Sequence, residues 1–426
     1  MFVRGVEERD VTRSGDSAEV IVVGGGPAGA TTAWGLARLG ADVLVVERAR
    51  FPRPKPCAEY LSPQASRVLA DMGALEPIEQ AGAAHLAGMT VRAPNGVTFE
   101  GRFAAAHGFR GFRDQGLAIR RPVLDAIVLD RARAAGARVA ERTQVTGVVR
   151  DASGRACGVR VRGDDGRDRD LLARLVVGAD GLHSVVARRL GLARTSRWPR
   201  RIAFVAHYRD VAGMGDCGEM LVGHAGYCGL ADVGGGITNV AIVVPRSRAA
   251  GARGDAASFF QRTLASQPGL AARFARATRV SQVQVTGPFA AHARRAWAAG
   301  AALVGDAADF FDPFTGEGIY AALRGGELLA PHLHAALRAG SSRASDAALA
   351  AYDRARRSEF AGKWRVERLV ALAVSSPFLL NQVARALARH THLADLLVGV
   401  AGDFVPAREL LRPGFLLPLL VPVRTR

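Results

Sequence analysis

The sequence contains little cysteine, and this scarcity limits the chemistry that it can carry. Four cysteines occur among the 426 residues, at Cys57, Cys157, Cys217 and Cys228. None of them forms a CxxC pair or lies near a histidine pattern suited to a metal. The sequence therefore excludes a disulfide framework, predicts no metal site, and favours a reducing, cytoplasmic environment.

Long hydrophobic runs are also missing. A membrane-spanning helix needs roughly 20 consecutive apolar residues, and no stretch of this chain reaches that length. Phe415–Val423 is apolar but shorter, and Pro418 and Pro422 interrupt it. Met1–Ala18 is polar and charged and lacks the apolar centre of a secretory signal. We therefore expect a cytoplasmic protein whose first strand follows a loose leader.

Lysine is almost absent, since only Lys55 and Lys363 occur. The formal net charge of +18 comes from arginine, which is scattered along the chain without a basic stripe interleaved with aromatics. Such scatter predicts no nucleic-acid partner. Attraction to acidic lipid head groups or anionic substrates stays open, and with it a peripheral contact with a membrane.

The amino-terminal sequence predicts a βαβ unit. Ala18–Gly24 is a short β-branched run that ends in glycines, and Asp42–Glu47 is a second apolar run. Between them, Pro27–Leu39 is rich in alanine and leucine and is closed by Gly40. These patterns predict two buried parallel strands joined by a helix. The right-handed crossover of such a unit is nearly obligatory.

Further along the chain, strands and helices alternate irregularly. Strands are expected within Leu86–Phe112, Arg138–Arg162, Leu172–Ala179, Arg201–Val244 and Ala301–Gly305. Helices are expected at Pro122–Ala135, at Ser258–Ala277, at Gly316–Leu337, and beyond Ser341 with breaks at Pro377, Pro406 and Pro413. The proline-rich segment Phe51–Ala65 is expected to be irregular.

This order predicts an α/β protein with a discontinuous, Rossmann-like nucleotide-binding domain of three layers. We expect this domain to comprise residues 18–85, 119–195 and 286–338. An inserted mixed-sheet substrate domain is expected at residues 86–118 and 196–285, and a C-terminal helical region at 339–426. The helical region is expected to cover the core as a lid, or to dock on a membrane surface.

A glycine-rich turn follows the first predicted strand. Gly24, Gly26 and Gly29 form a GxGxxG pattern that opens the helix. These glycines allow a tight turn, a close approach of the backbone to a pyrophosphate, and close packing of the helix on the sheet. Free N–H groups at the helix start attract the phosphates, and Pro27 is tolerated there. Glu47 ends the second strand, where a carboxylate accepts the hydroxyls of an adenosine ribose.

Three distant segments together resemble a known group of flavoproteins. The first is the glycine turn with Glu47 and Arg48, the second is Gly178–Arg188, and the third is Leu303–Ile319. Arg121 stands before the helix between the first two segments. In this order they are similar to the glutathione-reductase-type flavoproteins of the p-hydroxybenzoate-hydroxylase fold, which include the geranylgeranyl-reductase branch.

The resemblance implies that the cofactor is FAD. Asp306 would accept a hydrogen bond from a ribityl hydroxyl, and the turn after Pro313 would face the pyrimidine edge of the flavin. Asp180, in the second segment, would shape the joint between the domains. The implied FAD-binding residues are Gly24, Gly26, Pro27, Ala28, Gly29, Glu47, Arg48, Lys55, Pro56, Arg121, Asp306, Pro313, Gly316, Gly318 and Ile319.

The sequence leaves two reactions open. Lys55–Pro63 resembles the geranylgeranyl-reductase loop, which commonly reads Lys-x-Cys-Gly before Leu-Ser-Pro, although Ala58 replaces the glycine. The Tyr-x-Trp-x-Phe-Pro signature of that branch is missing, because Gly226–Ala231 reads GYCGLA. The Trp-x-Trp-x-Ile-Pro signature of flavin halogenases is missing as well. We therefore favour a monooxygenase, with reduction of isoprenoid C=C bonds as the alternative.

The favoured monooxygenase would use NAD(P)H and O₂ through a flavin C4a-hydroperoxide, on a hydrophobic aromatic or polyketide-like metabolite. A second GxGxxG is absent, so NAD(P)H is expected as a transient electron donor. Cys57 and Tyr227 are candidate catalytic residues, and a packing role for Cys57 is the alternative. The sequence leaves open whether the protein is a monomer or a homodimer.

Overall fold

The computed structural model describes residues 17–104, 107–224, 226–252, 254–267 and 269–420. The first sheet has the order β20-β21-β11-β1-β2-β8. Its central strand β1 (Ser17–Val23) lies parallel to β2 (Val43–Val46) and to β11 (Asp168–Gly178). Because both faces of these strands are covered, their valine and isoleucine runs are completely buried. The predicted βαβ unit and the α/β fold class are confirmed.

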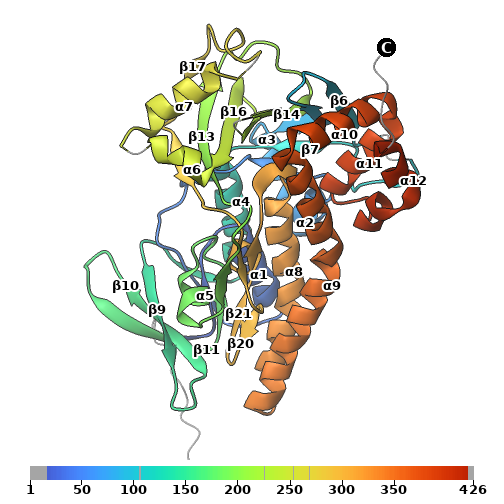
Figure 1. The fold of residues 1–426 in the computed structure, drawn as a ribbon. Coiled ribbons are helices and arrows are strands. Elements are labelled where there is room, and N and C mark those ends of the chain that lie inside the picture. The colour runs from blue at the N-terminus through green and yellow to red at the C-terminus, as the bar shows by residue number, and fades with distance from the viewer. Residues whose placement is uncertain (1–16, 105–106, 225, 253, 268, 421–426) are drawn as a thin grey trace, which may run out of the picture.

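Helices cover this sheet and hold the start of the glycine turn in place. Helix α1 (Pro27–Arg38) packs on α8 (Gly318–Leu337) and on α4 (Arg121–Ala134). A Cβ at Gly326 would lie 2.9 Å from the Ala28 carbonyl oxygen, so the contact between α1 and α8 requires glycine. The long helix α9 (Ser342–Ser375) runs beside α8 (Figure 1).

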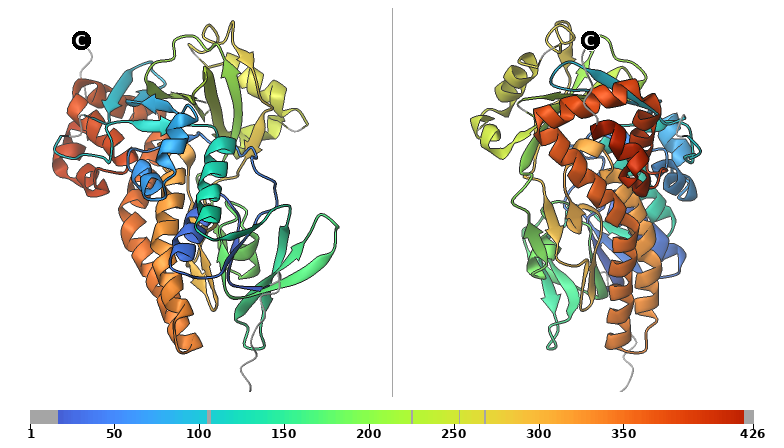
Figure 2. Two further views of the ribbon diagram at one scale, coloured as in Figure 1. Left: turned by 180° about the vertical axis from the view of Figure 1, so that it is seen from behind. Right: turned by 45° about the vertical axis from the view of Figure 1, so that its right-hand side comes forward.

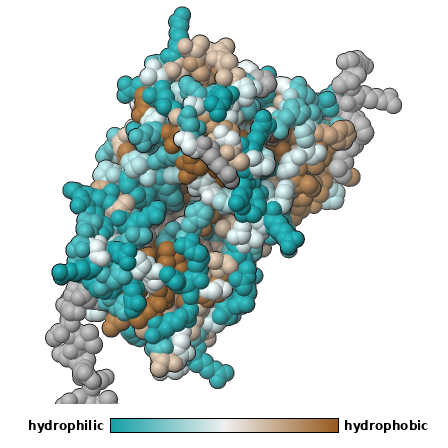
Figure 3. Space-filling view, turned by 60° about the vertical axis from the view of Figure 1, so that its left-hand side comes forward, coloured by the Kyte–Doolittle hydropathy of each residue, from teal (hydrophilic) through white to brown (hydrophobic). Residues whose placement is uncertain are grey.

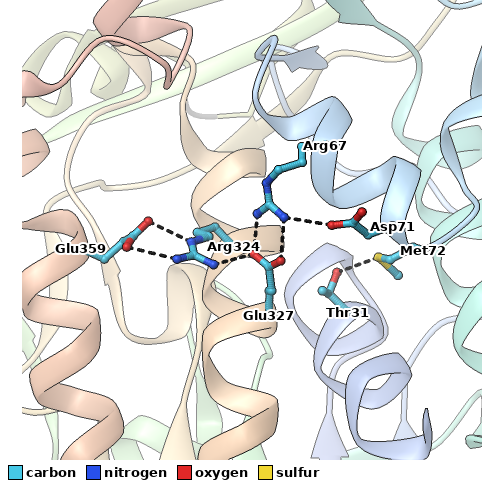
Figure 4. A network of polar contacts seen from close by, with 7 residues as sticks. All are labelled: Thr31, Arg67, Asp71, Met72, Arg324, Glu327 and Glu359. Atoms are coloured by element: carbon cyan, nitrogen blue, oxygen red, sulfur yellow. Dashed lines mark hydrogen bonds and ion pairs between the residues drawn. The ribbon is translucent and has the colours of Figure 1, made fainter. Parts of the chain in front are cut away.

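A network of ion pairs fixes α8 between two other helices (Figure 4). Glu327 of α8 accepts hydrogen bonds from Arg67 of α2 at 2.6 Å and from Arg324 at 2.6 Å. Arg324 in turn donates to Glu359 of α9 at 2.8 Å. The network therefore joins three segments that are far apart in the sequence.

The second sheet lies above the first in Figure 1 and has the order β17-β13-β16-β15-β14-β5-β6. Its central strands are β13 (Arg201–Arg209), β16 (Ile237–Pro245), β15 (Gly226–Asp232) and β14 (Cys217–Gly223), and its outer strands are β5 (Gly88–Arg92), β6 (Thr98–Arg102), β17 (Thr278–Arg279) and β18 (Gln284–Thr286). One face packs on α7 (Ala256–Ala265) through Phe259 and Phe260.

The other face of this sheet packs on the C-terminal helices, which therefore belong to the core. The hydrophobic cluster there combines Val205 and Val243 of the sheet with Leu380 and Leu393 of the helices. These helices are α10 (Pro377–Arg389), α11 (Thr391–Ala401) and α12 (Pro413–Leu420). The right-hand view of Figure 2 shows α10 crossing the end of α9.

Small elements complete the fold. The remaining strands are β3 (Tyr60–Leu61), β4 (Ala84–Leu86), β7 (Gly116–Ala118), β8 (Arg138–Ala140), β9 (Gln144–Arg150), β10 (Ala156–Arg162), β12 (Ala193–Thr195), β19 (Ala291–Ala293), β20 (Trp297–Ala298), β21 (Ala301–Leu303) and β22 (Asp309–Phe310). The remaining helices are α2 (Ala65–Asp71), α3 (Leu75–Gln80), α5 (Val185–Arg189), α6 (Arg246–Ala249), and the 3-10 turns η1 (Ala250–Ala252), η2 (Gly305–Ala307), η3 (Pro313–Thr315) and η4 (Ala407–Leu411).

Two expectations from the sequence need correction. The helix predicted at Ser258–Ala277 ends at Ala265. The sequence has Pro268 within the predicted span, and a proline disfavours the helical conformation in the residue before it. The segment Phe51–Ala65 is mostly irregular, but β3 within it pairs with β7. The domain boundaries stay a prediction. The expected leader, Met1–Ser17, lies outside the described residues except for Ser17.

Candidate functional site

The glycine turn has room for a ligand at one position and none at the other two. Gly24 has φ +101°, and a Cβ there would lie 2.5 Å from the Ala179 carbonyl oxygen. A Cβ at Gly29 would lie 1.9 Å from the Gly24 carbonyl oxygen. At Gly26, by contrast, the nearest atom to a Cβ would be Nη2 of Arg53 at 3.6 Å. Gly24 and Gly29 are therefore required by packing, whereas Gly26 leaves open space beside the N-terminus of α1.

Two arginines face this open space. Arg121 donates two hydrogen bonds to Asp125, both 2.7 Å long, and Nη1 of Arg53 lies 3.1 Å from the same carboxylate. Burial lowers the pKa of Arg121, but Asp125 and the Cys57 thiol raise it, so that it ends above its ordinary value. Arg53 also lies 3.9 Å from Glu47. The two guanidinium groups and the N–H groups at the start of α1 together offer donors that suit a pyrophosphate.

Glu47 lies buried at the end of β2, next to the glycine turn. Its carboxylate accepts hydrogen bonds from the backbone N–H groups of Gly25 at 2.9 Å and Ala49 at 3.0 Å. These two bonds fix the orientation of the carboxylate and leave its other lone pairs free for hydroxyl groups. The position matches that of the ribose-binding acid in dinucleotide folds.

We expect Glu47→Gln to weaken FAD binding about tenfold, or about 1.4 kcal/mol. The amide still accepts hydrogen bonds, but it loses the charge that strengthens bonds from ribose hydroxyls. The measurement is a fluorescence titration of the apoprotein with FAD. Glu76→Gln, at an exposed position on α3, is the matched control. Equal affinities for the two variants would show that Glu47 does not hold the ribose.

The second half of the site lies where β21 ends. Asp306 follows this strand, and its carboxylate lies 3.6 Å from Nζ of Lys55. The turn Pro313–Gly318 then leads into α8, with Gly316 at φ +73°. Asp312 anchors this turn: it accepts hydrogen bonds from Arg201 at 2.7 Å, Tyr227 at 2.7 Å and the Phe314 N–H at 3.2 Å.

One cavity connects the two halves. Its wall includes Gly26, Pro27, Ala28, Lys55, Pro56, Cys57, Arg121, Tyr227, Asp306, Pro313, Gly316, Gly318 and Ile319. Gly26 of the glycine turn, Asp306 and the turn Pro313–Gly318 thus line one cavity. This arrangement fits an extended dinucleotide such as FAD.

Comparison with known proteins agrees with this geometry. The chain matches the model of the family described as "FAD binding domain" over residues 17–366. The chain belongs to this family. It is 31% identical to digeranylgeranylglycerophospholipid reductase 2 of Methanopyrus kandleri, over 91% of this chain and 93% of the relative. It is 29% identical to menaquinone reductase of Mycobacterium tuberculosis, over 92% of both chains.

Solved structures show the same fold. The myxobacterial chondrochloren halogenase aligns with a TM-score of 0.77 at 23% identity, over 96% of this flavoprotein and 98% of the halogenase. A geranylgeranyl bacteriochlorophyll reductase-like protein from Thermoplasma acidophilum aligns with a TM-score of 0.71 at 23% identity, over 95% and 96% of the two chains. The flavoprotein is therefore an FAD-dependent oxidoreductase of the superfamily that the sequence resembles.

Four predicted FAD-binding residues do not line the cavity. Gly24, Gly29 and Glu47 lie just behind it and shape its end, as described above. Arg48 is exposed at the end of β2. Asp180 also lies behind the cavity, where its carboxylate accepts the Val185 N–H at the start of α5 at 2.6 Å. The individual roles of these residues stay predictions.

The two candidate catalytic residues differ in their surroundings. The Cys57 thiol lies on the cavity wall and accepts a hydrogen bond from the Glu59 N–H at 3.3 Å. Tyr227 is buried, and burial followed by the nearby Asp312 raises the pKa of Tyr227 well above its ordinary value. Its hydroxyl therefore stays protonated and donates to Asp312, which suits a positioning role for the turn.

Sequence reasoning missed a buried carboxylate behind Cys57. Glu59, at φ +61°, accepts hydrogen bonds from His207 at 2.7 Å, from Asn239 at 3.0 Å and from the Arg121 N–H at 2.8 Å. Asn239 also donates to the Cys57 carbonyl oxygen at 2.9 Å. Glu59 therefore attaches the Cys57 loop to the second sheet.

A second missed group lies on the cavity wall, where α9 meets the turn Pro313–Gly318. Lys363 forms ion pairs with Asp403 and, at 3.7 Å, with Glu317. Burial lowers the pKa of Lys363 and raises that of Glu317. Burial, followed by Glu317 and Asp309, also raises the pKa of Glu367 well above its ordinary value. That Lys363 is one of two lysines was the only signal in the sequence.

We expect Glu367→Gln to stabilise the protein at high pH and to leave it unchanged at low pH. Below the ordinary glutamate pKa the wild-type carboxyl is neutral in the folded and unfolded protein, like the amide. Between the ordinary glutamate pKa and the raised pKa of Glu367 in the folded protein, only the unfolded wild type loses its proton. Over this pH range the wild type therefore loses about 1.4 kcal/mol of stability for each pH unit, and the variant does not. Thermal unfolding from about pH 4 to about pH 9 measures the difference in stability between the variant and the wild type. Parallel profiles for the two proteins would contradict the raised pKa.

Proposed function

We propose that this flavoprotein reduces carbon–carbon double bonds in the isoprenoid chain of a lipid or lipid-soluble quinone. This proposal rests mainly on the cavity. The cavity extends from the residues expected to bind FAD to an apolar face of the second sheet. That face presents Ala203, Val205, Met220, Ala241 and Val243, and Phe289, which follows β18, lines the cavity as well. A wall of this kind suits a hydrocarbon chain, because it offers burial without polar groups that need partners.

The relatives support this proposal. The digeranylgeranylglycerophospholipid and menaquinone reductases align with more than nine tenths of this chain and of their own lengths. The loop Lys55–Pro63, which resembles the geranylgeranyl-reductase branch, contributes Lys55, Pro56 and Cys57 to the cavity wall.

The residues of the chain have distinct tasks in such a reaction. Bound FAD supplies the electrons. Asp312 holds the turn beside it through Arg201 and Tyr227, and the apolar wall keeps water from the reacting carbons. Glu367 lines the same cavity, and burial raises the pKa of its carboxyl group well above the ordinary value, which favours the protonated form. A saturated bond needs such a proton.

Anaerobic turnover tests the proposal. The protein with FAD is reduced by dithionite and mixed with menaquinone or digeranylgeranylglycerophospholipid, and the products are analysed by mass spectrometry. We expect the isoprenoid chain to gain the mass of two hydrogens for each reduced bond, without oxygen. For menaquinone this is read after the head group is reoxidised, because dithionite alone converts the quinone to the quinol. Parallel reactions with NADH and NADPH test whether a nicotinamide is the electron donor. Absence of any saturated product with both lipids would overturn the proposal.

The monooxygenase favoured from the sequence stays the second candidate. The observation behind it is strand β15, where the residues around Tyr227 lack the tryptophan and the Phe-Pro of the reductase signature. It predicts NAD(P)H oxidation that is stimulated by an aromatic substrate, together with incorporation of isotopically labelled oxygen into the product. Stimulated oxidation without incorporation would count against it.

A further inference from the structure

The C-terminal helices carry the most exposed large apolar side chains among the described residues. Phe378 of α10 is 85% exposed, Leu417 of α12 is 60% exposed, and Leu372 of α9 is 54% exposed. Leu369, one turn before Leu372, is 48% exposed. Isolated exposed leucines are common, but contiguous apolar surface of this kind marks a site of interaction.

The fold brings these side chains to one end of the molecule. Helices α9 and α10 meet at Ser376 with a bend of 111°, which places Phe378 at the corner just after Leu372. Helix α12 packs against α10. Figure 3 shows hydrophobic surface next to the point where the chain passes from α12 into its last residues. We call Leu369, Leu372, Phe378 and Leu417 the apolar corner.

Among the described residues, no single helix is long and apolar enough to cross a bilayer. Helices α9 and α10 pass that test of length and composition only as a pair. Leu372 and Phe378, on either side of the bend between them, are exposed.

Within residues 364–420, which surround the apolar corner, several arginines are exposed and no carboxylate is. Arg365 and Arg368 are exposed on α9, and Arg408 and Arg412 are 77% and 64% exposed beside α12. None of the acidic residues between Trp364 and Leu420 is exposed; they are Glu367, Asp395, Asp403 and Glu409. Glu100 of β6, which packs against α10, is exposed but forms an ion pair with Arg102 at 2.6 Å. This part of the surface therefore combines apolar side chains with arginines, of which Arg412 and Arg408 lie 2.6 Å and 3.6 Å from the buried Glu409 carboxylate. This combination complements a bilayer with acidic head groups, since the leucines and Phe378 can enter the acyl boundary while arginines contact phosphates.

We propose that the apolar corner docks the protein on the surface of an anionic lipid bilayer. A second copy of the chain fits less well, because the exposed arginines would face each other across the contact. An acidic bilayer supplies both the apolar layer and the negative charge.

The corner also lies next to the wall of the cavity. Helix α9 contributes Arg356, Phe360, Lys363, Trp364 and Glu367 to that wall. Leu369 and Leu372 follow on the next turns of the same helix. Docking would thus place the α9 side of the cavity close to the lipid. This last step rests on the proposed function, whereas docking itself does not depend on the reaction.

Sedimentation with vesicles tests the proposal on the full chain with FAD bound. The probes are vesicles of phosphatidylcholine alone and of phosphatidylcholine mixed with phosphatidylglycerol. We expect strong binding to the mixed vesicles, weak binding to the neutral ones, and release by salt. The double variant Leu372→Ser/Phe378→Ser should bind mixed vesicles at least about tenfold more weakly. Leu172→Ser is the matched control, because Leu172 of β11 is 52% exposed far from the corner.

Other results of these experiments would overturn either the docking proposal or the proposed function. Equal binding to both kinds of vesicle, or no difference between the double variant and the control, overturns it. Size-exclusion chromatography of the same proteins detects a dimer that the double variant abolishes, and such a dimer without vesicle binding would make the corner an interface between copies. Vesicle binding without any saturated product would overturn the proposed function alone.

Discussion

Gly26→Val is expected to fold normally and to lose FAD. Gly26 has φ −71°, a conformation that valine adopts without strain, and no protein atom lies within 3.4 Å of its Cβ position. The neighbours of this Cβ position are the ends of the Arg53 and Arg121 side chains, at 3.6 Å and 4.0 Å, which can move to admit the branched side chain. The valine side chain fills the space beside the start of α1 that the cofactor's phosphates need. We expect FAD affinity to fall at least a hundredfold, or about 2.7 kcal/mol.

Two measurements separate binding from folding in this variant. Calorimetric titration of the apoprotein gives the affinity for FAD, and thermal unfolding of the same apoprotein should match that of the wild type. Gly215→Val is the control, because nothing lies within 4 Å of its Cβ position either. Gly29→Ala should instead destabilise the apoprotein, since its Cβ would overlap the Gly24 carbonyl oxygen at 1.9 Å. An unchanged FAD affinity of Gly26→Val would mean that the dinucleotide does not pass over this residue.

Asp312→Ala is expected to lower the free energy of unfolding by about 3–5 kcal/mol, as for other buried ion pairs that lose one partner. The Arg201 and Asp312 side chains are 8% and 3% exposed. Without the carboxylate, Arg201 keeps its hydrogen bond to Ser375 Oγ at 2.8 Å. The Tyr227 hydroxyl loses the acceptor of its hydrogen bond. The visible spectrum of bound FAD should change as well, because Asp312 anchors the turn that faces the cofactor.

A less deeply buried ion pair, between Glu219 of β14 and Arg273 in the turns before β17, provides the comparison. Arg273 donates to Glu219 at 2.6 Å, and the two side chains are 18% and 19% exposed. Because solvent screens such a pair, Glu219→Ala should cost at most about 1 kcal/mol and leave the flavin spectrum unchanged. Chemical denaturation of both variants measures the difference. Equal losses of stability would show that the Asp312 cluster contributes no more than a surface pair.

The sequence predicted the parts of the site that depend on local order. Gly24, Gly26 and Gly29 have neighbours within one βαβ unit, so a short pattern carries their geometry. Asp306 and the turn after Pro313 were found because each follows a recognisable strand or precedes a recognisable helix. The structure brings these local pieces to one cavity.

Long-range partners could not be predicted in this way. Glu59 and His207 are 148 positions apart, and no periodicity in the sequence couples them. Arg53 stands in a proline-rich loop whose path depends on the rest of the fold. Lys363 reaches the cavity because α9 packs along α8 and continues past the turn Pro313–Gly318.

Helix α9 also bears on how the protein can move. Its 34 residues span about 51 Å at the usual rise. The first half packs in the core of the nucleotide sheet through Leu349 and Tyr352, and Val366 in the second half packs in the core of the other sheet. A single continuous helix thus packs on both the nucleotide sheet and the second sheet. A hinge motion that separates the two sheets would have to break this helix. Substrate entry and exit should therefore proceed by local shifts of side chains and loops at the rim, while the distance between the two sheets stays constant through the catalytic cycle.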